Sequence, residues 1–191
     1  RAPSPLPPNT YIKQPNLLAY DAELRPDLHM LQDIEACEIL KRHPHENLAT
    51  YYGCEVSNDG RVVGLCFEAY QQTLMEMVNP GHLSKHHPPD CSSTAADNYI
   101  SAIRNGIHHI HSLNLAHNDL NPSNIMFDAH DKPVIIDFDS CLPFDSCVST
   151  AKRTHGWFNP EIKISDPQND WDALSEMHAW LHGTTEKYKF S

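Results

Sequence analysis

Residues 115–140 read LAHNDLNPSNIMFDAHDKPVIIDFDS, and this stretch decides the fold. Short apolar runs at 125–127 and 134–136 flank a polar turn, a pattern typical of two short strands joined as a hairpin. Asn124 directly precedes the first run and Asp137 directly follows the second. A hairpin would therefore bring these two side chains to the same end.

An amide oxygen and a carboxylate that meet at one place form a hard-oxygen site, which suits Mg²⁺. Asp119 lies on the segment just before the hairpin and could accept a proton from an attacking hydroxyl. The layout predicts a phosphoryl-transfer loop with Asn124 and Asp137 as metal ligands.

The same residues resemble the catalytic loop H-R-D-L-K-P-x-N and the metal motif D-F-G of protein kinases. This chain has HNDLNPSN at 117–124 and DFD at 137–139. Its departures are Asn118 for Arg, Asn121 for Lys and Asp139 for Gly. The resemblance implies an α+β, two-lobed fold with an abbreviated N-lobe β-sheet and a mainly helical C-lobe that lacks the last helices.

Three segments are expected along the chain. Residues 1–9, with four Pro in the first eight positions, read as a tail or linker. Residues 10–70 would form a partial N-lobe and the hinge, without the Gly-rich loop that precedes the kinase Lys. Residues 71–191 would form a C-lobe that stops after the helix carrying Asp170. Because the chain starts with Arg rather than Met, a fragment is one interpretation.

The short β-prone run TYIK at 10–13 ends in Lys13, which by resemblance holds the α- and β-phosphates of ATP. A kinase also needs a Glu on the following helix, expected over 31–42, to pair with this Lys. Glu35 precedes the apolar Ile39 by four residues, the interval found in the family, so Glu35 is the predicted partner. Glu38 is the alternative, although a solvated acidic face explains it as well.

Strands are expected at 49–55 and 61–68, joined by a turn at 57–60. By resemblance Phe67 is the gatekeeper next to the adenine site. The hinge would follow, and its backbone groups would bond the adenine edge; it comprises Glu68, Ala69 and Tyr70.

In the second half, Thr94 with Asp97 three residues later predicts a capped helix start. Residues 154–161, THGWFNPE, resemble the end of a kinase activation loop. By resemblance, Asp170 would brace the catalytic loop from a buried helix. It could also cap that helix, and the two roles are compatible.

The net charge of −11 argues against a nucleic-acid-binding face. No apolar run is long enough for a transmembrane helix, so we expect a soluble, cytoplasmic protein. The six cysteines are scattered, which favours free thiols over three disulfides. The histidines are dispersed without a ligand spacing, and no zinc site is expected.

We therefore expect an ATP-dependent Ser/Thr protein kinase that transfers the γ-phosphate of MgATP to a protein substrate. Its catalytic set would be Lys13, Glu35, Asp119 and Asn124. One alternative is a small-molecule phosphotransferase of the aminoglycoside or choline kinase type, whose I-D-F/W-D/E pattern fits residues 136–139. The other is a pseudokinase-like binding module.

Overall fold

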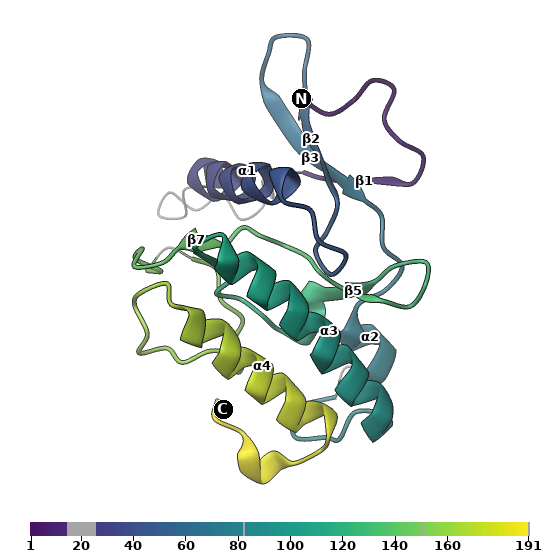
Figure 1. Ribbon diagram of the computed structural model, residues 1–191, viewed down its shortest axis with the longest axis vertical. Helices are drawn as coiled ribbons and strands as arrows, with labels where there is room; N and C mark the ends of the chain where they lie inside the picture. The colour runs from purple at the N-terminus through teal and green to yellow at the C-terminus, as the bar shows by residue number, and fades with distance from the viewer. Residues whose placement is uncertain (15–25, 82, 150, 191) are drawn as a thin grey trace.

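The computed structural model describes residues 1–14, 26–81, 83–149 and 151–190 (Figure 1). Residues 15–25, part of the expected N-lobe, lie outside the described residues. The α+β architecture is confirmed: a β-sheet with one helix forms one end, and helices dominate the other. The elements are β1 (Thr10–Lys13), α1 (Pro26–Arg42), β2 (Tyr51–Val56), β3 (Val62–Glu68), α2 (Leu74–Val78), α3 (Ser93–Ser112), β4 (Leu115–Ala116), η2 (Pro122–Asn124), β5 (Ile125–Phe127), β6 (Pro133–Ile135), β7 (Leu142–Pro143), α4 (Pro167–Leu181) and η3 (Thr185–Lys187).

The N-terminal sheet is antiparallel, in the order β1-β3-β2. The central strand β3 supplies the buried residues Leu65, Cys66 and Phe67, as expected for an apolar strand between two neighbours. In the β1–β3 register, Tyr11 lies opposite Phe67 and Lys13 opposite Leu65. Since side chains alternate along a strand, Tyr11 and Lys13 share one face of β1.

Helix α1 packs against β2 and buries a face with helical spacing. Its buried residues are Asp33, Ala36, Cys37 and Leu40, at positions i, i+3, i+4 and i+7. The carboxylate of Asp33 therefore lies within an otherwise apolar face of the helix.

Helices α3 and α4 lie side by side in the C-terminal half (Figure 1). The isoleucines of α3 recur at helical spacing and are all buried, as the sequence predicts. The start of α3 differs from the prediction: Ser92 is the N-cap, and its Oγ accepts from the Ala95 N–H. Asp97 consequently has no capping role and lies exposed on the helix surface.

All six cysteines are free, which confirms the expectation of thiols: Cys37, Cys54, Cys66, Cys91, Cys141 and Cys147. Within the described ranges, no helix has the length and apolar character needed to cross a bilayer.

The hairpin predicted from the sequence forms as β5 and β6, with Ile125 opposite Ile135. Helix α3 approaches it closely at Gly106. A Cβ built on Gly106 would lie 2.8 Å from Ile135 Cδ1 and 3.1 Å from the Asn47 backbone oxygen. The glycine thus allows α3 to pack closely against the hairpin that carries the candidate site.

We predict that Gly106→Ala lowers the free energy of unfolding by ~1 kcal/mol, although alanine favours a helix. The reason is that the new methyl meets a backbone oxygen, which cannot turn aside as a side chain can. Asn105→Ala, on the exposed face of the same helix, should leave stability unchanged or slightly raise it. Urea unfolding measures both, and a stabilised Gly106→Ala variant would contradict the close approach.

Candidate active site between the sheet and the helical half

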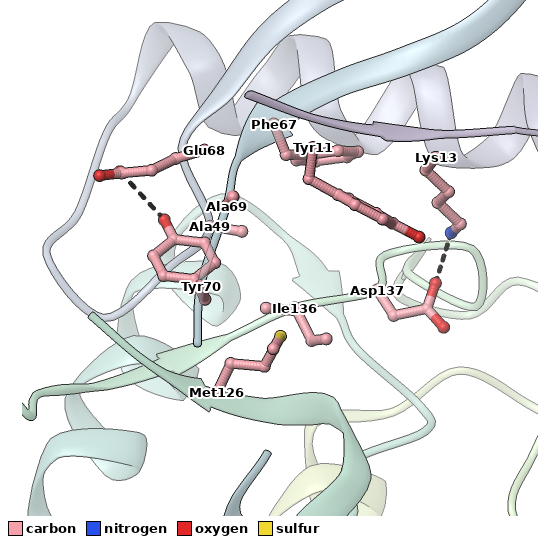
Figure 2. A pocket seen from close by; sticks show the side chains of 10 residues that line it. All are labelled: Tyr11, Lys13, Ala49, Phe67, Glu68, Ala69, Tyr70, Met126, Ile136 and Asp137. Carbon is pink, nitrogen blue, oxygen red and sulfur yellow. Dashed lines mark hydrogen bonds and ion pairs between the residues drawn. The ribbon is translucent and has the colours of Figure 1, made fainter. Parts of the chain in front are cut away.

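A cavity of about 380 Å³ opens between the sheet and the β5–β6 hairpin (Figure 2). Its wall is mostly apolar, with a lysine and a carboxylate at one side. It is lined by Tyr11, Lys13, Ala49, Phe67, Glu68, Ala69, Tyr70, Met126, Ile136 and Asp137. Six of the residues singled out in the sequence therefore meet in one cavity: Lys13, Phe67, Glu68, Ala69, Tyr70 and Asp137.

Lys13 lies at the polar side of this cavity, between two carboxylates. Its Nζ is 2.5 Å from Asp137 Oδ1 (Figure 2) and 2.6 Å from Asp33 Oδ2. The Asp33 side chain is 3% exposed and that of Asp137 is 19% exposed. One ammonium group thus joins β1, α1 and the segment after β6.

The predicted partner of Lys13 is wrong: the carboxylate comes from Asp33, not from Glu35 or Glu38. Glu35 is exposed, because two helical positions turn it about 200° away from Asp33 around the axis. Asp33 shares its buried face with Ala36 and Cys37, at i+3 and i+4. Apolar residues at 31, 34 and 39 also have helical spacing, so the sequence alone does not single out this face.

Attraction between Lys13 and its carboxylates competes with burial and with repulsion between Asp33 and Asp137, and burial raises the pKa of Asp33. Burial alone would lower the pKa of Lys13, but attraction to Asp33, Asp137 and Asp139 outweighs it and raises the pKa. Burial likewise opposes ionisation of Asp137, yet the charge and hydrogen bond of Lys13 lower the pKa of this carboxyl. Both groups are therefore charged at neutral pH.

Asp119 and Asn124 lie next to each other on the segment before β5. Asn124 Nδ2 donates to the Asp119 backbone oxygen at 2.9 Å and to Asp119 Oδ2 at 3.2 Å. The Ile136 N–H donates to the Asn124 carbonyl at 3.0 Å, so Asn124 and Asp137 occupy the same end of the hairpin, as predicted. An amide oxygen from Asn124 and a carboxylate oxygen from Asp137 are donors that fit Mg²⁺.

Thr154 holds the Asp119 carboxylate from the opposite side. The Thr154 N–H donates to Asp119 Oδ1 at 2.6 Å, and its hydroxyl to Oδ2 at 3.1 Å. Asn121 Nδ2 in turn donates to the Thr154 hydroxyl oxygen and to the Asp119 carbonyl. Burial raises the pKa of Asp119, while the Thr154 hydrogen bonds act in the opposite direction.

Asp170 fixes the backbone in front of Asp119. Its two carboxylate oxygens accept the N–H groups of His117 and Asn118, each at 2.8 Å. His111 Nε2 lies 2.8 Å from the same carboxylate. The expected bracing by Asp170 is confirmed, whereas its alternative role as a helix cap is wrong because Asp166 caps α4.

Asn118 stands where the kinase motif has Arg, and its side chain forms hydrogen bonds within the protein. Its φ of 63° is a backbone conformation that Asn tolerates better than most residues. Its buried Nδ2 donates to three acceptors, the Ala116 and Ser140 carbonyls and Ser165 Oγ. The side chain thereby joins the segment that carries Asp119 to the segment that leads into α4.

The comparisons with known proteins agree with this geometry. The family model described as "Protein kinase domain" matches residues 22–180. The serine/threonine-protein kinase/endoribonuclease IRE1 of Hypocrea jecorina is 28% identical over 152 residues, covering 72% of this chain and 12% of that protein. The mitogen-activated protein kinase kinase kinase YODA of Arabidopsis thaliana is 27% identical, covering 83% of this chain and 17% of that protein.

A third relative, the serine/threonine-protein kinase Sgk2 of Rattus norvegicus, is 29% identical over 121 residues, covering 58% of this chain and 32% of that protein. The chain therefore spans between an eighth and a third of the length of these relatives. The family match extends over most of the chain, from the segment before α1 into α4, and includes Asp33, Asp119, Asn124, Asp137 and Asp170. This chain belongs to the protein kinase family.

Proposed function

We propose that this chain transfers the γ-phosphate of MgATP to a Ser or Thr hydroxyl of a protein. The observation that carries the proposal is Lys13, held between Asp33 and Asp137 at the polar side of an apolar cavity. A flat apolar base and a charged polyphosphate need this combination of apolar wall and fixed charge.

Lys13 would hold the α- and β-phosphates, with its ammonium group kept charged and oriented by Asp33. Asn124 and Asp137 would hold Mg²⁺, which neutralises phosphate charge when it is bound. Lys13 already bonds one Asp137 oxygen, and the exposed Lys152 lies 4.0 Å from the second. The metal would bind that second oxygen in place of Lys152. Preorganised charges of this kind are the main source of rate enhancement in phosphoryl transfer.

Asp119 would orient the substrate hydroxyl and accept its proton as the new O–P bond forms and the bond to the ADP leaving group breaks. Its position is fixed from two sides, by Asn124 and by the Thr154 N–H and hydroxyl. The raised pKa of Asp119 makes it a stronger base than an exposed carboxylate.

The adenine base would lie between Ala49 and Phe67 on the sheet side and Met126 and Ile136 on the hairpin side. At the hinge, Asn9 engages Ala69 twice: Asn9 O accepts the Ala69 N–H, and Asn9 Nδ2 donates to the Ala69 carbonyl. The Glu68 N–H also has a partner, the Thr50 carbonyl at 2.9 Å, so the base edge would be recognised by the Tyr70 backbone.

Asp33→Asn should reduce kcat/KM for ATP at least tenfold, because Lys13 loses the charge that orients it while side-chain volume stays the same. Glu35→Gln is the matched control on the same helix and should retain activity, since Glu35 is exposed. Steady-state phosphorylation kinetics measure both. If kcat/KM fell in Glu35→Gln and not in Asp33→Asn, Glu35 rather than Asp33 would be the functional partner of Lys13.

Asp137→Asn should abolish the Mg²⁺ dependence of ATP binding, because it removes the metal's charged ligand with little change in shape. Asp119→Asn should bind MgATP like wild type but transfer no phosphate. Thermal-shift titrations with ATP, with and without Mg²⁺, measure binding through the added stability of the bound state.

Three other outcomes would count against this proposal. Mg²⁺-dependent binding that survives in Asp137→Asn would contradict the assigned metal site. Failure of wild type to bind MgATP at all would favour a binding module. Transfer to a small alcohol or aminoglycoside, but not to protein, would favour the small-molecule phosphotransferase.

Tyr11 projects over the cavity from the same face of β1 as Lys13 (Figure 2). Its ring would cover the adenine, and base–aromatic stacking contributes ~1–3 kcal/mol. Tyr11→Ala should therefore weaken ATP binding about fivefold or more, whereas Tyr11→Phe keeps the ring and should bind like wild type. Calorimetric titration distinguishes them, and tighter binding by Tyr11→Ala would mean that the ring blocks the cavity instead.

A further inference from the structure

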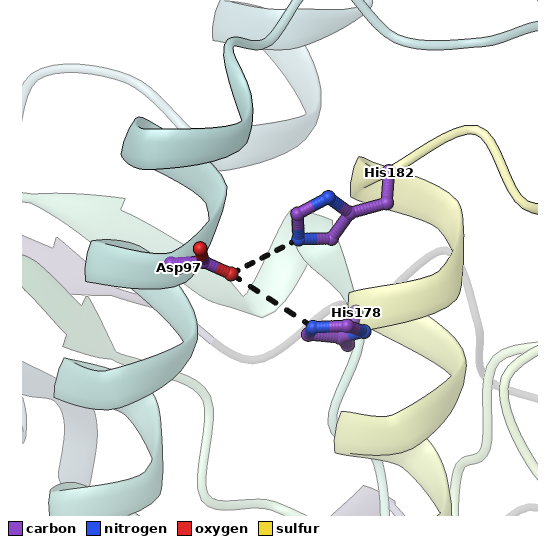
Figure 3. Close-up of side chains that lie close together, drawn as sticks. All are labelled: Asp97, His178 and His182. Atoms are coloured by element: carbon purple, nitrogen blue, oxygen red, sulfur yellow. Dashed lines mark hydrogen bonds and ion pairs between the residues drawn. The ribbon is translucent and has the colours of Figure 1, made fainter.

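Three side chains with metal-binding atoms meet on the surface of the helical half, away from the cavity lining. Asp97 comes from α3, His178 from α4 and His182 from the end of α4 (Figure 3). Asp97 Oδ1 lies 3.1 Å from His182 Nε2 and 3.9 Å from His178 Nε2. All three ligand atoms lie within 4.8 Å of one another.

The spacing of the two histidines is suited to chelation. Residues i and i+4 lie on one face of a helix, and two histidines at this interval bind zinc from a single helix. Tetrahedral bonds of 2.0–2.2 Å place neighbouring ligand atoms about 3.3–3.6 Å apart. The two measured separations from Asp97 bracket this value, so small side-chain rotations would suffice.

The donor set selects a class of metal. Two imidazole nitrogens and one carboxylate suit Zn²⁺ and related transition metals, whereas Mg²⁺ and Ca²⁺ require mostly oxygen ligands. Arg104 and Lys187 also act on His178 with positive charge. These cations oppose any divalent ion, so binding at this site depends on the coordinate bonds of the two imidazoles.

We propose that Asp97, His178 and His182 bind one Zn²⁺ ion that clamps α3 to α4. The ion takes the place of the hydrogen bond from His182 to Asp97, and its binding requires both imidazole Nε2 atoms to be unprotonated. The partial exposure of His178 and Asp97 leaves room for water at the fourth position.

This clamp lies apart from the proposed Mg²⁺ site. Asp170, which braces the catalytic loop, precedes His178 by eight residues, or about 12 Å along α4. The ion would therefore tie together the far ends of the two helices whose other ends lead to the catalytic loop and hold Asp170.

The test is calorimetric titration of Zn²⁺ into the 191-residue chain after metal removal, with Co²⁺ absorption as a second probe of imidazole coordination. Wild type should bind one Zn²⁺ at this site and melt at a higher temperature with the metal. His178→Gln, His182→Gln and Asp97→Asn should each weaken this binding at least tenfold. Two matched controls should retain it: His130→Gln, an exposed histidine elsewhere, and Asp137→Asn in the cavity.

Three results would overturn the proposal. The first is that wild type binds no Zn²⁺, and the second is that the double variant His178→Gln/His182→Gln binds Zn²⁺ as wild type does. The third is that Asp137→Asn alone removes the binding, which would place the ion in the cavity. Circular dichroism of each variant without metal verifies that the fold is kept, both at the exposed Asp97 and His178 and at the half-buried His182.

Discussion

The ion pairs of Lys13 with Asp33 and Asp137 are the interaction on which the arrangement of the site depends. They connect residues separated by 20 and by 124 positions in the chain, and so join the sheet, α1 and the segment after the hairpin at one atom. A partly buried cation is stable only if anions surround it, and those anions keep the pKa of Lys13 raised. The same arrangement fixes the ammonium group of Lys13 beside an apolar cavity, and this is the group that would contact a bound polyphosphate.

The helical half supplies a second set of constraints, centred on Asp170. This fully buried carboxylate accepts two successive backbone N–H groups, which fixes the conformation of the chain just before Asp119. Asn118 and Asn121 add side-chain hydrogen bonds at positions where the kinase motif has cations. Polar networks of this kind orient a carboxylate through hydrogen bonds. The positive charge near Asp119 comes instead from Arg153, whose Nε donates to the Asn118 carbonyl.

Much of this could be predicted from the sequence, because local patterns specify local structure. The hairpin, the buried isoleucines of α3 and the role of Asp170 follow from spacing and from the motif. The partner of Lys13 could not be predicted reliably, because α1 carries four acidic residues and its mixed pattern leaves the buried face ambiguous. The cluster of Asp97 with His178 and His182 was missed for a different reason: two helices far apart in the chain must pack before its ligands meet.

The central claim is that Lys13 holds the phosphates of ATP, and the most direct test compares two lysine variants. Lys132 is an exposed lysine paired with Glu46, with its side chain 52% exposed, so Lys132→Met is the matched control for Lys13→Met. The measurement is the affinity for MgATP by calorimetric titration. We expect Lys13→Met to lose at least tenfold in affinity, equivalent to about 1.4 kcal/mol, while Lys132→Met binds like wild type. Equal affinity in Lys13→Met and wild type would contradict the claim.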